Sequence, residues 1–141
     1  MQKRESGTQG FEINMQKVVF DTNVLVSYLI NGNGVPAKAV SLFFDGKIDV
    51  FYSNIIYEEY EEVLNREHFH FDKTKILKIL KDLTIYGKLI NPVASLFLMS
   101  DEDDRIFYDT AKQSGSFLIT GNKRHYPQEN FILTPAEFLE T

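Results

Sequence analysis

The sequence predicts an α/β fold with three layers, in which helices cover both faces of a central, mainly parallel sheet. Short apolar runs alternate along the chain with longer segments of helical periodicity, the pattern of parallel strands joined by helical crossovers. The chain of 141 residues suits one domain, and its 43% hydrophobic content is ordinary for a globular protein. We expect that domain to span residues 15–141. Residues 1–14 are polar, and we expect them to form a flexible N-terminal extension.

The first half of the chain predicts two strands and four helices. Lys17–Phe20 is a short apolar run that indicates a buried strand, and Thr22 can cap the helix that follows it. Asn31–Gly34 ends that helix, and Pro36 suits the first turn of the next, which stops at Asp45-Gly46. The other elements expected here are a strand over 48–52, a helix from Ser53 or Asn54 to Arg66, and a helix from Phe71 to Tyr86.

The second half predicts one long helix, two strands and a terminal helical turn. Ser100 would begin the helix, with Asp103 completing its capping box, and Ser114-Gly115 would end it. Strands are expected over 117–120 and 131–133, and the terminal turn begins at Pro135. In such folds ligands bind at the carboxyl ends of the strands. Asp21 and the Gly121-Asn122 turn both follow strands directly, so we expect them to meet at this edge.

Three carboxylates are candidates for chemistry. Asp21 follows a strand, where an acid either caps the next helix or serves as a metal ligand or nucleophile. Glu59 falls inside a wide apolar arc of its helix, and a carboxylate there is unfavourable unless it is paired or bound to metal. Asp104 projects inward between Tyr108 and Ala111, whereas the acids before it suit the helix dipole. Oxygen ligands of this kind favour Mg²⁺ or Mn²⁺.

Composition and charge narrow the function classes. The chain has no cysteine, which excludes disulfides, thiolate zinc sites and cysteine nucleophiles and fits a cytoplasmic location. No apolar run is long enough to span a membrane. The net charge of −5 argues against a protein that coats nucleic acid, but not against a local basic rim. His68, His70 and His125 do not have the spacing of a zinc site.

Four segments together resemble the PIN domain family, and most closely its bacterial toxin-like, VapC-related members. They are VVFDTNVLV from Val18, SNIIYEEYEEVL from Ser53, DEDDRIFYDTA from Asp101 and LITGNKRHY from Leu118. The likeness runs in family order over residues 15–141. It implies a PIN-like α/β/α domain and Mg²⁺- or Mn²⁺-dependent cleavage of RNA, with Asp21, Glu59 and Asp104 as catalytic metal ligands.

The resemblance also implies supporting roles around these acids. The fourth family ligand is often an aspartate, which is Asn122 here, and Asp101 could supply the missing charge. Thr22, Asn23, Ser53 and Thr120 would support the ligands, and Lys123, Arg124 and His125 would grip the phosphate backbone. The expected partners are RNA, a cognate antitoxin protein and a second copy of the chain. A homodimer is also expected because the first two helices carry abundant apolar side chains: Leu25, Tyr28, Leu29, Val40, Phe43 and Phe44.

Two other functions fit parts of the pattern. The chain could be a degenerate PIN-like module that binds RNA or a partner without cutting, and Asn122 favours this reading. It could also be a phosphoryl-transfer domain that uses Asp21 as nucleophile. The haloacid-dehalogenase-like enzymes, which place an aspartate after their first strand, have a second one two residues later, where this chain has Asn23.

Overall fold

The computed structural model describes residues 15–96 and 98–141, and its centre is a parallel sheet. The expected extension over residues 1–14 lies outside the described residues. The strand order is β3-β2-β1-β4-β5, and every pairing is parallel. The strands are β1 (Lys17–Phe20), β2 (Asp49–Tyr52), β3 (Lys88–Leu89), β4 (Phe117–Ile119) and β5 (Ile132–Leu133).

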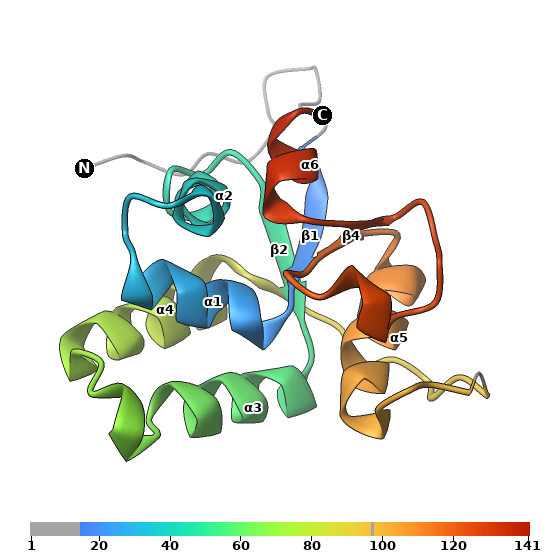
Figure 1. Ribbon diagram of the computed structural model, residues 1–141, viewed down its shortest axis with the longest axis horizontal. Coiled ribbons are helices and arrows are strands. Elements are labelled where there is room, and N and C mark those ends of the chain that lie inside the picture. Colours follow the sequence, from blue (N-terminus) through green and yellow to red (C-terminus); the bar gives the residue numbers. More distant parts are fainter. Residues whose placement is uncertain (1–14, 97) are drawn as a thin grey trace.

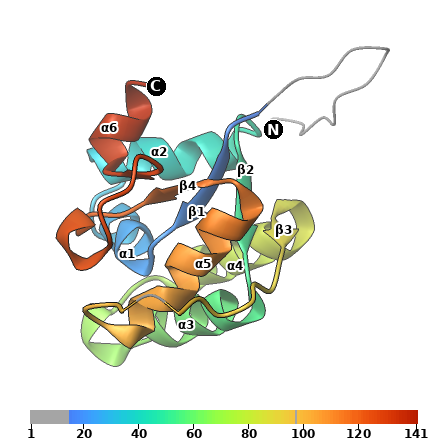
Figure 2. The same cartoon turned by 90° about the vertical axis from the view of Figure 1, so that its right-hand side faces the viewer.

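Helices cover both faces of this sheet, which confirms the predicted α/β/α class. Figure 1 shows the strands between α1, α2 and α4 on one side and α5 on the other, and Figure 2 shows α5 crossing in front of the sheet. The helices are α1 (Thr22–Ile30), α2 (Val35–Phe44), α3 (Asn54–Leu64), α4 (Lys73–Tyr86), α5 (Arg105–Ser114) and α6 (Pro135–Leu139). Short 3₁₀ turns lie at η1 (Glu67–Phe69), η2 (Glu102–Asp104) and η3 (Lys123–His125).

The central strand β1 and its neighbour β4 are buried over most of their length. Val18 and Val19 of β1 and Leu118 and Ile119 of β4 have no exposed surface. Continuous apolar runs of this kind are typical of parallel strands buried on both faces. Because both strands are buried in the core, the positions of the residues that directly follow them are fixed.

Several element boundaries differ from the predicted ones. Asp21, not Thr22, caps α1, and Asp101, not Ser100, caps η2, which precedes α5. In both cases an aspartate carboxylate accepts a hydrogen bond from the backbone N–H two residues on, which the neighbouring hydroxyl does not do. Strand β3 was not predicted, because it has two residues and both are exposed. The third helix ends at Leu64, and the fourth begins at Lys73.

The apolar side chains of α1 and α2, from which a homodimer was expected, pack largely within the protomer. Leu25, Val40 and Phe43 are at most 4% exposed, and Tyr28 packs against Phe44 with ring centroids 5.9 Å apart. This burial removes much of the stated reason for a dimer, although it does not test the dimer itself. Within the described residues, no helix is both long and apolar enough to cross a membrane.

Candidate functional site

The ends of β1 and β4 lie side by side and bring Asp21 to Thr120, the residue directly before the Gly121-Asn122 turn that was expected to meet Asp21. Asp21 comes directly after β1, and its backbone N–H donates to the Ile119 carbonyl at 2.9 Å. Thr120 follows β4 and has no exposed surface, and its hydroxyl donates to Asp21 Oδ2 at 2.9 Å. The first candidate acid is therefore held at the carboxyl edge of the sheet.

The two carboxylate oxygens of Asp21 have different surroundings. Oδ2 accepts hydrogen bonds from the hydroxyls of both Thr120 and Tyr126, at 2.9 and 2.8 Å. Oδ1 accepts one long bond, 3.4 Å, from the backbone N–H of Asn23. Oδ1 is therefore the carboxylate oxygen with the weaker contact to the protein.

Glu59 approaches the same edge from α3. Its Oε2 accepts a hydrogen bond of 2.7 Å from the Thr22 hydroxyl, at the start of α1. Burial raises the pKa of Glu59, with a smaller rise from the Asp21 charge, while the bond from Thr22 lowers it. Its helix neighbour Ile55 is 58% exposed, so Glu59 lies at the border of the buried face and not inside it.

Asp104, at the end of η2, carries a carboxylate oxygen with no hydrogen-bond partner. Its Oδ2 is buried and accepts no hydrogen bond from the described part of the chain, and His125 Nδ1 lies 3.9 Å away. Burial, followed by the charges of Asp21 and Asp101, raises the pKa of Asp104 to about 6. A carboxylate with one buried oxygen left in this state is unfavourable, and a bound cation would relieve it.

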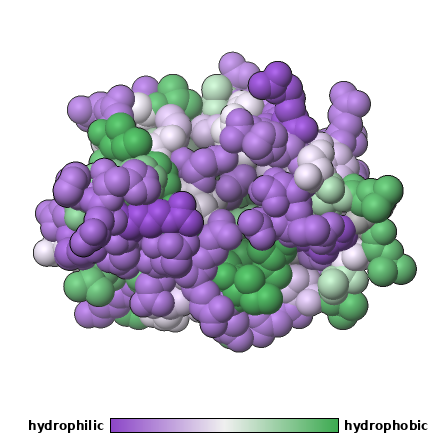
Figure 3. All heavy atoms as spheres, turned by 60° about the horizontal axis from the view of Figure 1, so that its bottom comes forward, coloured by the Kyte–Doolittle hydropathy of each residue, from purple (hydrophilic) through white to green (hydrophobic). Residues whose placement is uncertain are grey.

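The three acids therefore share one electrostatic environment. Asp21 raises the pKa of both Glu59 and Asp104, and Glu59 adds to the rise at Asp104. Among residues 15–96 and 98–141, no three histidine or acidic side chains are close enough to form a ready-made metal cluster. That the acids share one cation thus stays a prediction. The face of the molecule that carries α3 is largely hydrophilic (Figure 3).

The expected supporting residues each make an identifiable contact. Asn23 Oδ1 accepts the Gly121 N–H at 3.1 Å, which ties the start of α1 to the turn after β4. The Asn122 N–H donates to the Thr120 hydroxyl at 3.0 Å, and the residue itself is exposed. Ser53 caps α3 by accepting the Ile56 N–H, so it positions the helix that carries Glu59.

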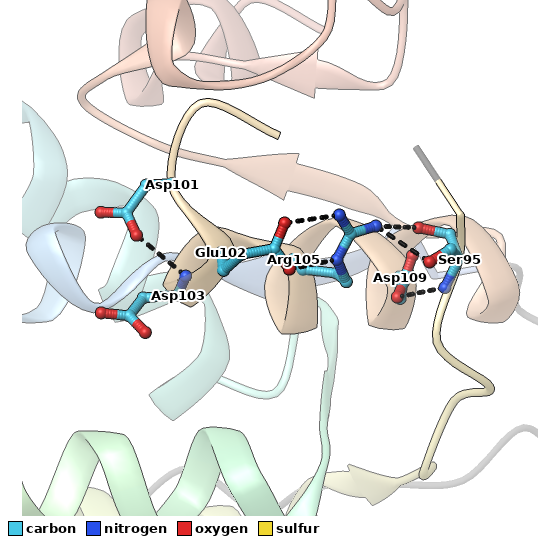
Figure 4. Close-up of polar contacts among 6 residues, drawn as sticks. All are labelled: Ser95, Asp101, Glu102, Asp103, Arg105 and Asp109. Carbon is cyan, nitrogen blue, oxygen red and sulfur yellow. Dashed lines mark hydrogen bonds and ion pairs between the residues drawn. The ribbon is translucent and has the colours of Figure 1, made fainter. Parts of the chain in front are cut away.

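Two separate sets of hydrogen bonds lie at the start of α5, and Asp101 belongs to the first of them. Its carboxylate accepts the Asp103 N–H at 2.9 Å, so it is already used as a helix cap. Figure 4 shows Arg105 between Glu102 and Ser95, with hydrogen bonds of 2.8 to 3.0 Å on the two sides. The Ser95 N–H donates to Asp109. This second set anchors the segment around Ser95 to α5.

The three basic residues after Asn122 have unequal partners. Lys123 Nζ forms an ion pair with Glu137 of α6 at 3.0 Å. Arg124 is exposed and has no hydrogen bond or ion pair within the described residues. His125 faces the Asp104 carboxylate. Arg124 is thus the most available cation of the three, and their contact with RNA stays a prediction.

Tyr126 is the residue of this site that sequence reasoning missed. It is 7% exposed, and its hydroxyl donates to Asp21. Burial and the charges of Asp21 and Asp104 raise the pKa of Tyr126, so the hydroxyl keeps its proton and remains a donor. The available signal was an aromatic residue directly after a run of four polar residues, which indicates that the loop folds back onto the core.

Comparison with known proteins adds family information to this geometry. A model of the PIN domain matches residues 17–124, a range that contains Asp21, Glu59, Asp104 and Asn122. The chain is also 35% identical over 139 residues to an uncharacterized protein of Methanocaldococcus jannaschii, and the match covers 88% of this chain and 90% of that protein.

Proposed function

Because the chain belongs to the PIN domain family, whose members are generally nucleases, we propose that it is an Mg²⁺- or Mn²⁺-dependent endoribonuclease. It cleaves RNA phosphodiester bonds with water as the nucleophile. The observation that carries this proposal is the buried Oδ2 of Asp104, which has no hydrogen-bond partner in the described part of the chain and whose carboxyl has a pKa raised by burial and by the charges of Asp21, Asp101 and Glu59. An unpaired carboxylate beside two other acids is a setting that favours a divalent cation.

The donor set fits a hard divalent cation. Asp21 would contribute Oδ1, Asp104 would contribute its unpaired Oδ2, and Glu59 would complete the acidic side. Asp101 and Asn122 are the further candidates at its border. A bound Mg²⁺ or Mn²⁺ would supply Lewis-acid activation of a water and would offset charge on the phosphate.

The chain's own residues would divide the remaining work. Thr120 and Tyr126 orient Asp21, and Thr22 orients Glu59. Glu59, whose pKa is raised, would also orient the attacking water. The phosphate backbone of the RNA would be held by Arg124, with Lys123 and His125 beside it.

The toxin-like resemblance extends the proposal to partners. The protein would be the toxin component of a toxin–antitoxin pair, acting on RNA in the cytoplasm as a homodimer. The test is growth arrest on expression of the chain, relieved by co-expression of the adjacent reading frame. Light scattering at micromolar concentration tests the dimer, and a monomer mass would contradict it.

RNA cleavage as a function of metal concentration tests the nuclease activity itself. Asp21→Asn should abolish cleavage, because it removes cation affinity. Asn122→Asp should lower the metal concentration needed for half-maximal cleavage, because an amide is a weaker cation ligand than a carboxylate. Cleavage that survives EDTA, or that is unchanged in Asp21→Asn, would contradict the proposal.

A non-cutting PIN-like module is the second candidate. It is favoured by a neutral residue, Asn122, at the fourth family position and by the absence of a ready-made metal cluster in the described part of the chain. RNA binding with no cleavage in either Mg²⁺ or Mn²⁺, for both wild type and Asn122→Asp, would support this module over the enzyme.

A further inference from the structure

A pocket of about 830 Å³ opens between the loop after β4 and strand β5. Its wall includes Lys123, Arg124 and Tyr126 on the loop side and Ile132 and Leu133 on the strand side. Figure 2 shows this stretch, between β4 and α6, as an orange-red loop at the left of the view. The volume is within the range of pockets that hold small organic ligands.

One side chain joins this pocket to the acidic site. The Tyr126 hydroxyl donates to Asp21 Oδ2 at 2.8 Å, and the same residue lines the pocket. Tyr126 therefore borders the pocket and also contacts the first of the three acids. A nucleic-acid strand with a phosphate at the acids would have its neighbouring nucleoside beside the pocket.

The lining combines groups that suit a nucleotide. Arg124, at the wall, has no partner within the described residues and can meet a phosphate. Gln128 and Asn130 are exposed, and their amides make no hydrogen bond with the described part of the chain. Such amides present a donor and an acceptor together, which is the pairing that reads the edge of a base.

Glu129, an acid in the lining of the pocket, already has a hydrogen-bond donor and a cation as partners. Glu129 accepts a hydrogen bond from the Tyr108 hydroxyl and lies 3.9 Å from Lys112 Nζ. Its negative charge is thus partly balanced, and it opposes a phosphate less than a free carboxylate would. A purely anionic ligand would leave the two amides unused, whereas a nucleotide uses both the cation and the amides.

We propose that this pocket receives the base of the nucleotide next to the cleaved phosphate, and that Gln128 and Asn130 select which base is accepted. The proposal rests on the proposed nuclease function for its substrate class. It assigns the choice of cleavage site to the loop after β4 and not to the acids, which contact only phosphate and water.

The test is binding of fluorescein-labelled RNA hexamers of adenine, cytosine or uracil, measured by anisotropy with Ca²⁺ in place of Mg²⁺. Wild type should bind one hexamer at least about fivefold more tightly than another, the discrimination expected of an amide pair on a base edge. The variant Gln128→Ala/Asn130→Ala should reduce that ratio to below about twofold while the weakest hexamer keeps its affinity. Asn33→Ala, an exposed amide in the turn between α1 and α2, is the matched control and should bind as wild type does.

The outcomes separate this proposal from the nuclease function. Equal binding of all hexamers by wild type, or a preference that the double variant retains, would overturn the pocket assignment even if the protein cuts RNA. A preference that the double variant loses would support the pocket even if no RNA is cut. Cleavage positions mapped on a mixed-sequence RNA should show the same base preference beside the cut, and should lose it in the double variant.

Discussion

Replacing Asp104 by asparagine should stabilise the metal-free protein and remove its response to metal. The wild-type carboxylate has a buried Oδ2 without a hydrogen-bond partner and lies in the field of Asp21 and Glu59. An asparagine of the same shape has no charge to bury. It would relieve the repulsion and at the same time remove a strong cation ligand.

The size of the effect follows from the pKa of Asp104, which rises from 3.8 to about 6. In full, that rise corresponds to about 3 kcal/mol between folded and unfolded protein. Because the carboxyl is partly hydrated, solvent screening reduces the expected gain in Asp104→Asn to roughly 1 to 1.5 kcal/mol. For a domain of this length the melting temperature should rise by about 4 to 6 °C.

The pH dependence has a defined sign. A carboxyl with a higher pKa when folded binds more protons in the folded state, so stability falls as pH rises. Metal-free wild type should therefore lose stability relative to Asp104→Asn between pH 3.8 and about pH 6. Below that range both proteins carry a neutral group at this position and should be equally stable, and above it the difference should be constant.

Thermal unfolding in EDTA and in Mg²⁺ measures both effects. At a Mg²⁺ concentration about tenfold above Kd, wild type should gain about 1.4 kcal/mol, and Asp104→Asn should gain much less. Asp103→Asn, an exposed acid in the same turn, is the control; it should change stability by no more than about 0.5 kcal/mol and keep the Mg²⁺ response. A metal-free Asp104→Asn that is less stable than wild type at pH 7, or equal Mg²⁺ gains in both, would refute the reasoning.

Three further changes probe the surroundings of the acids. Tyr126→Phe removes a hydrogen bond to a charged acceptor and should lower the free energy of unfolding by about 1.5 to 3 kcal/mol, measured in urea. Thr22→Val removes the bond that lowers the pKa of Glu59, so the acidic limb of the pH–rate profile for cleavage should move to higher pH. Arg124→Ala should weaken RNA binding more than Lys123→Ala, as measured by anisotropy over a salt series, because Lys123 already has a carboxylate partner.

A specific result would contradict each of these three predictions. Tyr57→Phe, a partly buried tyrosine whose hydroxyl makes no hydrogen bond within the described residues, should cost little, and equal losses in the two Phe variants would contradict the role of Tyr126. An unchanged pH–rate profile in Thr22→Val would mean that Glu59 does not titrate in the reaction. A larger loss of RNA affinity in Lys123→Ala would reverse the ranking of the two cations.

The fold class was predictable because it depends on local patterns of apolar residues. The apolar run over β1 and the helical spacing of apolar residues in α4 each predict which side chains face the core. The structure buries the predicted side chains Val18, Val19, Ile76 and Leu80. Strand β3 was not predictable, since its two residues are exposed and its pairing with β2 leaves no apolar signal. The choice of cap at α1 and η2 was also open, because adjacent side chains with similar acceptors differ only in their geometry.

What the sequence determined by itself about the candidate site is which carboxylates are out of place. Glu59 and Asp104 fall on positions that the helical pattern predicts to face inward, where a carboxylate conflicts with simple solvation, although the structure places Glu59 at the border of the buried face. Parallel pairing then brings the residues after β1 and β4 to one edge, as a general property of such sheets.

Only the tertiary structure decided how the acids are held and which of their oxygens remain available. Thr120 and Tyr126 lie 99 and 105 residues from Asp21 along the chain, yet both donate to the same oxygen. No local pattern encodes these bonds, because they form when the loop after β4 folds back over the end of β1. The same is true of the buried, unpartnered oxygen of Asp104, since its lack of a donor depends on every element packed around it.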